Sequence, residues 1–178
     1  MDLTEYDVFV NASARWANIG ATGRAMVTEF IEQGGEYIGL LQRGVRFAKD
    51  AGILETTYGV SDADENGILE VLFELDDPLA STYRERDTVY AYEPVWFTEY
   101  PDTSYVVASL PEEDFYMAGF WAEPELAAGH AVVIRDIVLS DDEVVNGVVL
   151  FGIHPTFRAH PQKTFRLLAN AVYWAALR

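Results

Sequence analysis

The residues of this chain best suited to chemistry are His154, Thr156 and Arg158, which follow the apolar run Val148–Ile153. A histidine can accept and donate protons near neutral pH, and an arginine can hold a carboxylate or a phosphate. The apolar run is short and rich in β-branched residues, so it predicts a strand buried on both faces. Ligands of open α/β sheets bind outside the carboxyl ends of strands, so the sequence predicts a site at this turn.

A second segment with the pattern of a catalytic site is Gly34–Gly44, which reads GGEYIGLLQRG. It predicts a buried strand, Glu36–Leu41, that turns sharply toward a short helix, Arg43–Asp50, as at the nucleophile elbow of several α/β enzymes. Leu41 and Gln42 stand where the nucleophile would be. Leucine has no lone pair and glutamine is a poor nucleophile, so we expect a structural turn without a reactive group.

The other candidate residues do not have the pattern of a metal site. His154 and His160 are six residues apart and lack the helical spacing and the added carboxylate of a zinc site. Asp62–Gly67 resembles a calcium loop but has no glutamate at the twelfth position, which favours a solvated turn. The chain contains no cysteine, so disulfides, thiolate ligands and cysteine nucleophiles are excluded. We therefore expect neither a metal nor a cofactor.

Two other functions would use different residues. A hydrolase could combine His154 and Arg158 with a carboxylate such as Glu123, if an acid lies within hydrogen-bond reach of the histidine. A carbohydrate- or peptide-binding module could use Trp121 and other aromatic side chains of the middle third, if several are exposed on one face. The aromatic residues of this region are Tyr90, Tyr92, Trp96, Phe97, Tyr100, Tyr105, Phe115, Tyr116, Phe120 and Trp121.

The elements that would position these residues alternate between strands and helices near both ends of the chain. Tyr6–Asn11 has the β-branched and aromatic character of a strand. Gly20–Gln33 has the apolar spacing of a helix that ends at a pair of glycines. A further helix would begin at Pro161, with an apolar face formed by Phe165, Leu168, Ala169, Val172, Tyr173 and Ala176.

The middle third predicts short strands in place of helices. Its strand-like runs are Ile68–Leu75, Thr88–Tyr92, Val95–Thr98, Ser104–Ala108, Tyr116–Ala122 and Ala131–Leu139, and Ser140–Asn146 has the composition of an acidic turn. We therefore expect a single α/β domain over residues 1–178, a three-layer sandwich of flavodoxin-like character. Its sheet would be mostly parallel, with a partly antiparallel β-insertion.

The composition limits the partners of the chain. The formal net charge is −17, and of the 12 basic residues only Lys49 and Lys163 are lysines. Such a surface repels nucleic acids and anionic lipids, and no run approaches the roughly 20 apolar residues of a membrane span. We expect neither a nucleic acid nor a membrane as partner. Acidity of this degree is typical of soluble proteins and of extracellular or salty settings.

Longer stretches of the chain resemble known proteins. GGEYIGLLQRG, followed by AGIL at Ala51–Leu54, and VVLFGIHP at Val148–Pro155 resemble two strands of the class I glutamine amidotransferase-like superfamily. A closer resemblance is to the amidotransferase-like domain at the C-terminal end of some secreted M14-type zinc carboxypeptidases. It rests on four patches in the same order, Asp76–Tyr83, Tyr90–Phe97, Met117–Val133 and Val148–Ala175.

The departures from the superfamily imply an inactive relative. Its catalytic cysteine would fall on Leu41, and the glutamate that follows its His-Pro pair would fall on Thr156, so only His154 is kept. The resemblance implies a non-catalytic accessory domain of a secreted carboxypeptidase, whose zinc motif is not in these residues. The implied partners are the chain's own upstream peptidase domain or its peptide substrate. The implied location is extracellular, with the cytoplasm as the alternative.

The resemblance also implies that a segment of the family's domain is missing. That domain begins with a strand-helix-strand segment ahead of the strand at Tyr6–Asn11, so we expect this chain to be an excised piece of a longer one. The loss would leave Tyr6–Asn11 at an edge of the sheet, where unpaired backbone groups can pair with another chain. A homo-oligomer formed through this edge is therefore a further expectation.

Overall fold

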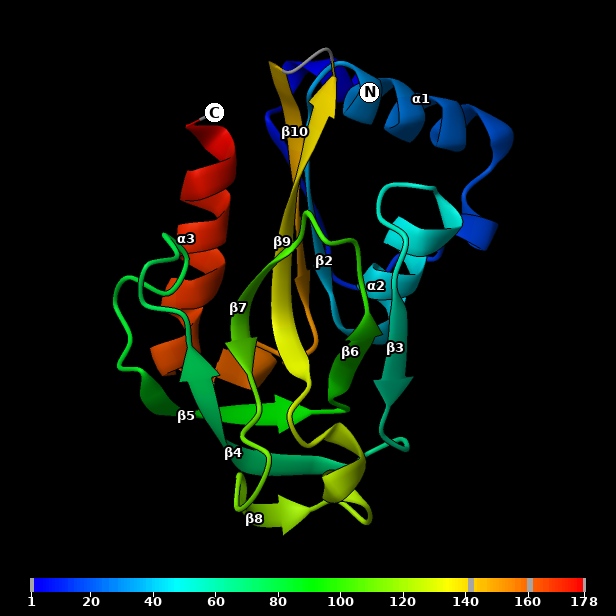
Figure 1. Ribbon diagram of the computed structural model, residues 1–178. Helices are drawn as coiled ribbons and strands as arrows, with labels where there is room; N and C mark the ends of the chain where they lie inside the picture. The colour runs from blue at the N-terminus through cyan, green and yellow to red at the C-terminus, as the bar shows by residue number, and fades with distance from the viewer. Residues whose placement is uncertain (1, 141–142, 160–161, 178) are drawn as a thin grey trace.

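The computed structural model describes residues 2–140, 143–159 and 162–177 (Figure 1). Strand β1 (Val8–Asn11), helix α1 (Ala21–Glu32) and strand β2 (Glu36–Leu40) form the predicted strand-helix-strand unit, and the two strands are parallel. Strand β10 (Glu143–Phe151) pairs in parallel with the other side of β2. Because β1 ends the strand order on this side, its predicted place at a sheet edge is confirmed.

Most of the sheet is antiparallel, and the prediction of a mostly parallel sheet was wrong. Beyond β10 the strand order continues through β9 (Ala131–Ser140), β7 (Tyr105–Ser109), β4 (Asn66–Phe73) and β5 (Arg86–Tyr92), each antiparallel to its neighbour. Strands β9 and β10 follow each other as a hairpin whose pairing reaches Ser140 and Glu143, so most of the predicted acidic turn is strand. A hairpin needs no crossover helix and reverses the direction of the chain.

Three further strands lie off this path. Strand β6 (Val95–Glu99) pairs with β9 and with β3 (Thr57–Val60), and β8 (Tyr116–Phe120) pairs with β4. All of these pairs are antiparallel, which confirms the partly antiparallel β-insertion. The sequence did not predict β3. Strand β3 contains Gly59, where an added Cβ would lie 2.1 Å from the Trp96 ring. The Trp96 ring therefore fills the space that a side chain at position 59 would need.

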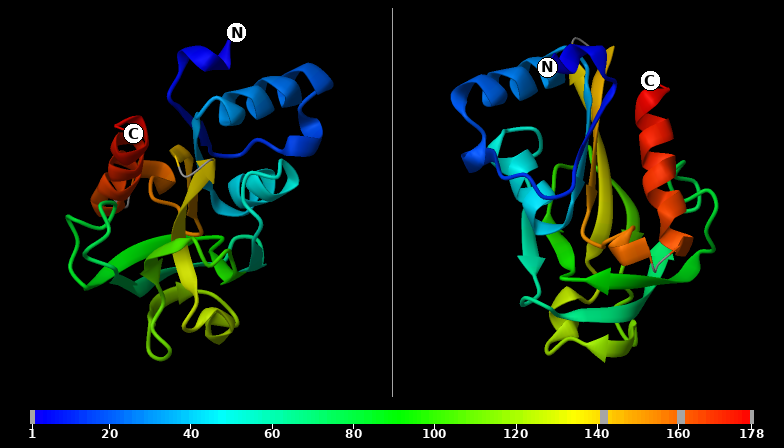
Figure 2. Two further views of the ribbon diagram at one scale, coloured as in Figure 1. Left: turned by 45° about the horizontal axis from the view of Figure 1, so that its top comes forward. Right: turned by 180° about the vertical axis from the view of Figure 1, so that it is seen from behind.

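Helices cover both faces of the parallel part of the sheet. Helix α3 (Phe165–Ala176) lies on one face, and α1 and α2 (Leu41–Asp50) lie on the other (Figures 1 and 2). Successive residues of a strand point to opposite faces, so Ile38 packs in the core beneath α3 whereas Tyr37 packs in the core beneath α2. This part of the molecule therefore has the three layers expected of a flavodoxin-like fold.

The apolar face predicted for α3 was partly wrong, although its Leu168 and Val172 do pack half-buried against the core. Its buried residues are Leu167, Ala171 and Ala175, whereas the predicted Tyr173 is 69% exposed. Apolar residues form two stripes along this helix, and packing against the sheet buries only one of them. Pro161, the predicted start, lies outside the described residues, and α3 itself begins at Phe165. Among the described residues, no helix is long and apolar enough to cross a membrane.

Candidate functional site

The turn from β2 into α2 has the geometry of a nucleophile elbow. Leu40 is extended, with φ −107°, and the next residue, Leu41, has φ 53°, in the left-handed region that non-glycine residues rarely adopt. Such a conformation costs a non-glycine residue roughly 1–3 kcal/mol and persists only where the surrounding structure holds it. The predicted strand that passes sharply into a helix is confirmed, with leucine at its strained position.

Two glycines allow the helix to start this close to the strand. An added Cβ at Gly44 would lie 2.7 Å from the carbonyl carbon of Gly39, and one at Gly39 would lie 2.9 Å from the carbonyl oxygen of Gly44. The buried hydroxyl of Tyr37 donates to that same oxygen at 2.8 Å and accepts from Asn11 Nδ2 at 2.9 Å. Burial raises the pKa of Tyr37, so the hydroxyl stays protonated and keeps this link between β1, β2 and α2.

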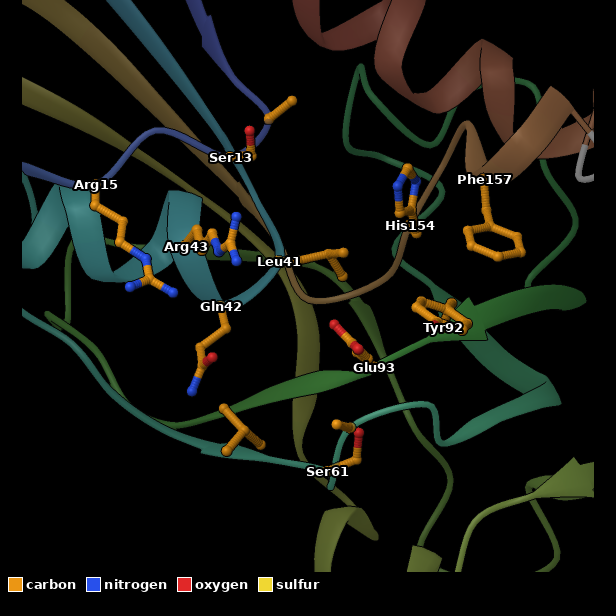
Figure 3. Close-up of a pocket in the computed structure, with 13 residues that line it drawn as sticks. Ser13, Arg15, Leu41, Gln42, Arg43, Ser61, Tyr92, Glu93, His154 and Phe157 are labelled. Atoms are coloured by element: carbon orange, nitrogen blue, oxygen red, sulfur yellow. The ribbon is translucent and has the colours of Figure 1, made fainter. Parts of the chain in front are cut away.

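A cavity of about 400 Å³ opens in front of the elbow (Figure 3). Five segments that are distant in sequence line it: the chain after β1, the first turn of α2, the loop after β3, the end of β5 and the chain after β10. Leu41 and His154 both line this cavity, so the structure brings together the two sites that the sequence suggested separately. The cavity lies outside the carboxyl ends of β2 and β10, as expected for an α/β sheet.

His154 lies at this cavity, and its Nδ1 is buried without a hydrogen-bond partner among the described residues. Its ring meets Phe157 edge to face, with ring centroids 5.5 Å apart. Burial lowers the pKa of His154 below its ordinary value of 6.5, and the negative charge of Glu93 opposes this effect. The imidazole is therefore neutral near pH 7 and can still form a hydrogen bond.

The pKa of His154 predicts a pH dependence of stability. Because the folded state binds the proton more weakly than the unfolded state, the free energy of unfolding should fall as the pH drops below 6.5. Urea unfolding at about pH 7.5 and about pH 5.5 should show a larger loss for the wild type than for His154→Gln. An equal loss in the two proteins would contradict the assignment of a buried neutral histidine.

Glu93 is one of the cavity residues that the sequence patterns did not predict. It follows β5 with φ 48°, and its Oε1 accepts a hydrogen bond from the backbone N–H of Asp64 at 3.3 Å. Its backbone N–H donates to Glu65 O at 2.7 Å, which fixes the strained turn. In the sequence, Glu93 is recognisable only as an acidic residue between a predicted strand and Pro94. No local pattern relates this position to His154, which comes 61 residues later.

The other residues predicted for a site do not line the cavity. Arg158 is exposed, with its guanidinium 5.1 Å from the centroid of the Phe157 ring. Glu123 precedes the short 3₁₀ helix Pro124–Ala127. Trp121 is 6% exposed and packs against Trp96 and two other aromatic rings, so it belongs to the core. Thr156 also does not line the cavity, and the remaining site pair is Leu41 and His154.

The structure also bears on the two alternative functions. For a hydrolase built on His154, Arg158 and Glu123, the described residues place no carboxylate in hydrogen-bond contact with His154 Nδ1. The aromatic surface loses Trp96 and Trp121, which are both buried, whereas Tyr105 and Phe120 are 51% and 68% exposed. Within the described ranges, no three His, Asp or Glu side chains gather in a way that could hold a metal ion.

Comparisons with known proteins identify the fold. A scan against protein-family models finds no match, and a search of curated proteins finds no similar sequence. Among solved structures, a GMP synthase subunit from Thermoplasma acidophilum is similar, with TM-score 0.57 and 13% identity, over 99% of this chain and 77% of that one. A glutamine amidotransferase from Thermotoga maritima has TM-score 0.50 and 13% identity, over 95% of this chain and 63% of that one.

A third similar structure comes from a much larger enzyme. The β-galactosidase of Bacillus circulans sp. alkalophilus matches with TM-score 0.54 and 14% identity, over 97% of this chain but only 23% of that one. Identities this low show the fold alone, and the resemblance to a carboxypeptidase-associated domain stays a prediction. The chain has the fold of the glutamine amidotransferase-like proteins, an α/β fold of flavodoxin-like character.

Proposed function

We propose that this chain is a non-catalytic amidotransferase-like domain. The observation that carries the proposal is Leu41, which occupies the strained position between β2 and α2 and lines the cavity beside His154. A covalent mechanism at an elbow needs a side chain with a lone pair at this position. Leucine supplies only hydrocarbon, so the architecture of the site is kept without the group that would attack a substrate.

We further propose that the domain is accessory to a secreted zinc carboxypeptidase. The support is the resemblance of four ordered patches of sequence to the domain found at the C-terminal end of such enzymes. The β-galactosidase comparison adds that a fold of this kind can form a minor part of a much longer chain. The domain would act through surface contacts with the peptidase domain or with its peptide substrate, and the exposed edge of β1 could pair with a second copy.

A hydrolase remains the second candidate, because one observation favours it. The cavity holds a histidine and a carboxylate, His154 and Glu93, and the histidine Nδ1 has no partner among the described residues. A bound water between the two groups could then be activated without a protein nucleophile.

An activity assay separates these two functions. The isolated chain should not hydrolyse glutamine, p-nitrophenyl acetate or a short peptide above the rate in buffer, and His154→Ala should behave in the same way. Turnover by the wild type that His154→Ala and Glu93→Gln both abolish would establish the hydrolase and overturn the proposal. Unfolding curves of the variants show whether any loss comes from loss of the fold.

Cysteine labelling tests the elbow itself. The chain has no cysteine, so a thiol introduced at position 41 or position 40 is the only one present. Leu41→Cys should react readily with iodoacetamide, because residue 41 lines the cavity and the start of α2 lowers the pKa of a thiol there. Leu40→Cys is the matched control, since Leu40 is 4% exposed, and it should react much more slowly in the folded protein. Equal slow labelling of both would show that position 41 does not face the cavity.

A further inference from the structure

One side of the cavity carries two arginines that have no acidic partner in the described part of the chain. Arg15 and Arg43 both line it, and among the described residues neither guanidinium forms an ion pair or a hydrogen bond. The chain has 29 acidic and 12 basic residues, so carboxylates are plentiful as partners. Arg46, one helical turn after Arg43, does pair with Asp50 at 3.4 Å. Within the described residues, the charges of Arg15 and Arg43 are therefore not neutralised by an ion pair.

The same two arginines border a second cavity of about 210 Å³. Arg15, Gln42 and Arg43 line both cavities, so the guanidinium groups stand where the two adjoin. Figure 3 shows them on the side of Gln42, with His154 and Glu93 on the other side of Leu41. The first turn of α2 contains no acidic residue, and Asp50, which lines the second cavity at the end of α2, pairs with Arg46. The positive charge of this wall is available to a ligand.

The opposite wall of the cavity combines aromatic and polar side chains. Tyr92 and Phe157 stack with ring centroids 4.5 Å apart, and both line the cavity together with Leu41 and Val60. Glu93 lies on this side as well, with one carboxylate oxygen facing the Asp64 backbone N–H at 3.3 Å. A carboxylate accepts several hydrogen bonds, so Glu93 retains capacity for a donor on a ligand.

We infer that this cavity binds a small carboxylate that carries an apolar group, such as the C-terminal residue of a peptide. The ligand carboxylate would pair with Arg15 and Arg43, since guanidinium groups bind carboxylates through charge-assisted hydrogen bonds. The apolar group would lie against Leu41 and Phe157, and a peptide N–H would donate to Glu93. The inference rests on the proposed function, because a site without a nucleophile binds such a ligand and releases it unchanged.

Calorimetric titration of the full chain with three probes tests the inference. The probes are N-acetyl-leucine, its amide N-acetyl-leucinamide, and 4-methylpentanoate, which keeps the carboxylate and the apolar group but lacks the peptide N–H. N-acetyl-leucine should bind, and the amide should bind about tenfold more weakly or worse, because charge-assisted hydrogen bonds are lost. Tighter binding of N-acetyl-leucine than of 4-methylpentanoate identifies a peptide C-terminus as the ligand, and equal binding identifies a free carboxylic acid.

Three variants locate the bound carboxylate. Arg15→Gln and Arg43→Gln should each weaken binding of N-acetyl-leucine by about tenfold. Arg86→Gln is the matched control, because it removes an arginine that pairs with Glu70 and lines neither cavity, and it should leave binding unchanged. Circular dichroism confirms that each variant is folded.

Three outcomes would overturn the inference, and none concerns catalysis. They are failure of N-acetyl-leucine to bind, equal affinity for the acid and the amide, and unchanged binding in both Arg15→Gln and Arg43→Gln. Hydrolysis of N-acetyl-leucine during the titration, followed by the release of free leucine, would instead contradict the proposed non-catalytic function. If N-acetyl-leucine neither binds nor is hydrolysed, the inferred ligand is wrong but the proposed non-catalytic function is not contradicted.

Discussion

Replacing Gly152 with alanine should lower the free energy of unfolding by about 3 kcal/mol or more. An added Cβ at this position would lie 1.9 Å from the carbonyl oxygen of Val95 and 3.0 Å from that of Val132. Both contacts are with backbone, which cannot move aside as a side chain can. Gly152 also donates to Val132 O at 2.7 Å and accepts from Val95 N at 2.8 Å, so relief of the clash would break the links between β10, β9 and β6.

The same substitution should weaken the site. Gly152 stands two residues before His154, and its partner Val95 stands two residues after Glu93. The contact between the backbones at Gly152 and Val95 therefore fixes the positions of His154 and Glu93 relative to each other in the cavity. Urea unfolding measures the loss of stability, and titration with N-acetyl-leucine measures the loss of binding in whatever fraction stays folded.

Gly20→Ala is the matched control for Gly152→Ala. No atom lies within 4 Å of a Cβ added at Gly20, which precedes α1 with φ −63°. Alanine is a less favourable residue than glycine at the start of a helix, so a loss of about 1 kcal/mol or less is expected. Similar losses in the two variants would show that the backbones do not approach at Gly152 as closely as described.

Removing Asp77 should destabilise the fold by about 3–5 kcal/mol. Asp77 and Arg135 form an ion pair with 2.5 Å between Oδ2 and Nε, and their side chains are only 5% and 11% exposed. Asp77→Ala would leave the Arg135 guanidinium desolvated between Tyr105 and Trp174, 4.2 Å and 5.3 Å from the two ring centroids. It would also remove the acceptor of the Leu79 backbone N–H, at 2.9 Å. Thermal and urea unfolding measure the effect.

Two further variants distinguish a lost ion pair from general damage. Glu55→Gln removes the partner of Lys49 in a pair whose side chains are 81% and 38% exposed, and it should change stability by less than about 1 kcal/mol. The double variant Asp77→Leu with Arg135→Met removes both buried charges, so it should be more stable than Asp77→Ala alone. If the double variant is the less stable of the two, the loss in Asp77→Ala is not caused by an unpaired buried charge.

Sequence patterns were sufficient to predict the local parts of this fold. The apolar run Val148–Ile153 is buried along its whole length, and GGEYIGLLQRG forms a strand, a strained turn and a helix. These features depend on β-branched residues, on glycines and on neighbours within a few positions. The absence of a nucleophile at Leu41 is likewise a property of the sequence, because no fold gives leucine a lone pair.

The direction of the strands and the buried face of α3 could not be predicted in this way. An apolar strand run reads the same in either direction, so the hairpin of β9 and β10 was not distinguished from a parallel pair. The C-terminal helix has apolar residues on more than one stripe, and contact with the sheet buries the stripe of Leu167 and Ala171 while Tyr173 stays exposed. Each of these choices depends on partners that are distant in sequence.

What the sequence alone determined is an elbow without a reactive group and the buried strand that comes shortly before His154. Only the tertiary structure placed Glu93 in the same cavity and Trp121 in the core. It also left Arg15 and Arg43 without an acidic partner in the part of the chain that the structure describes. The physical reason is that backbone preferences act over a few residues. The composition of a cavity depends on which strand ends and loops the folded sheet brings together, and here these come from five separate segments.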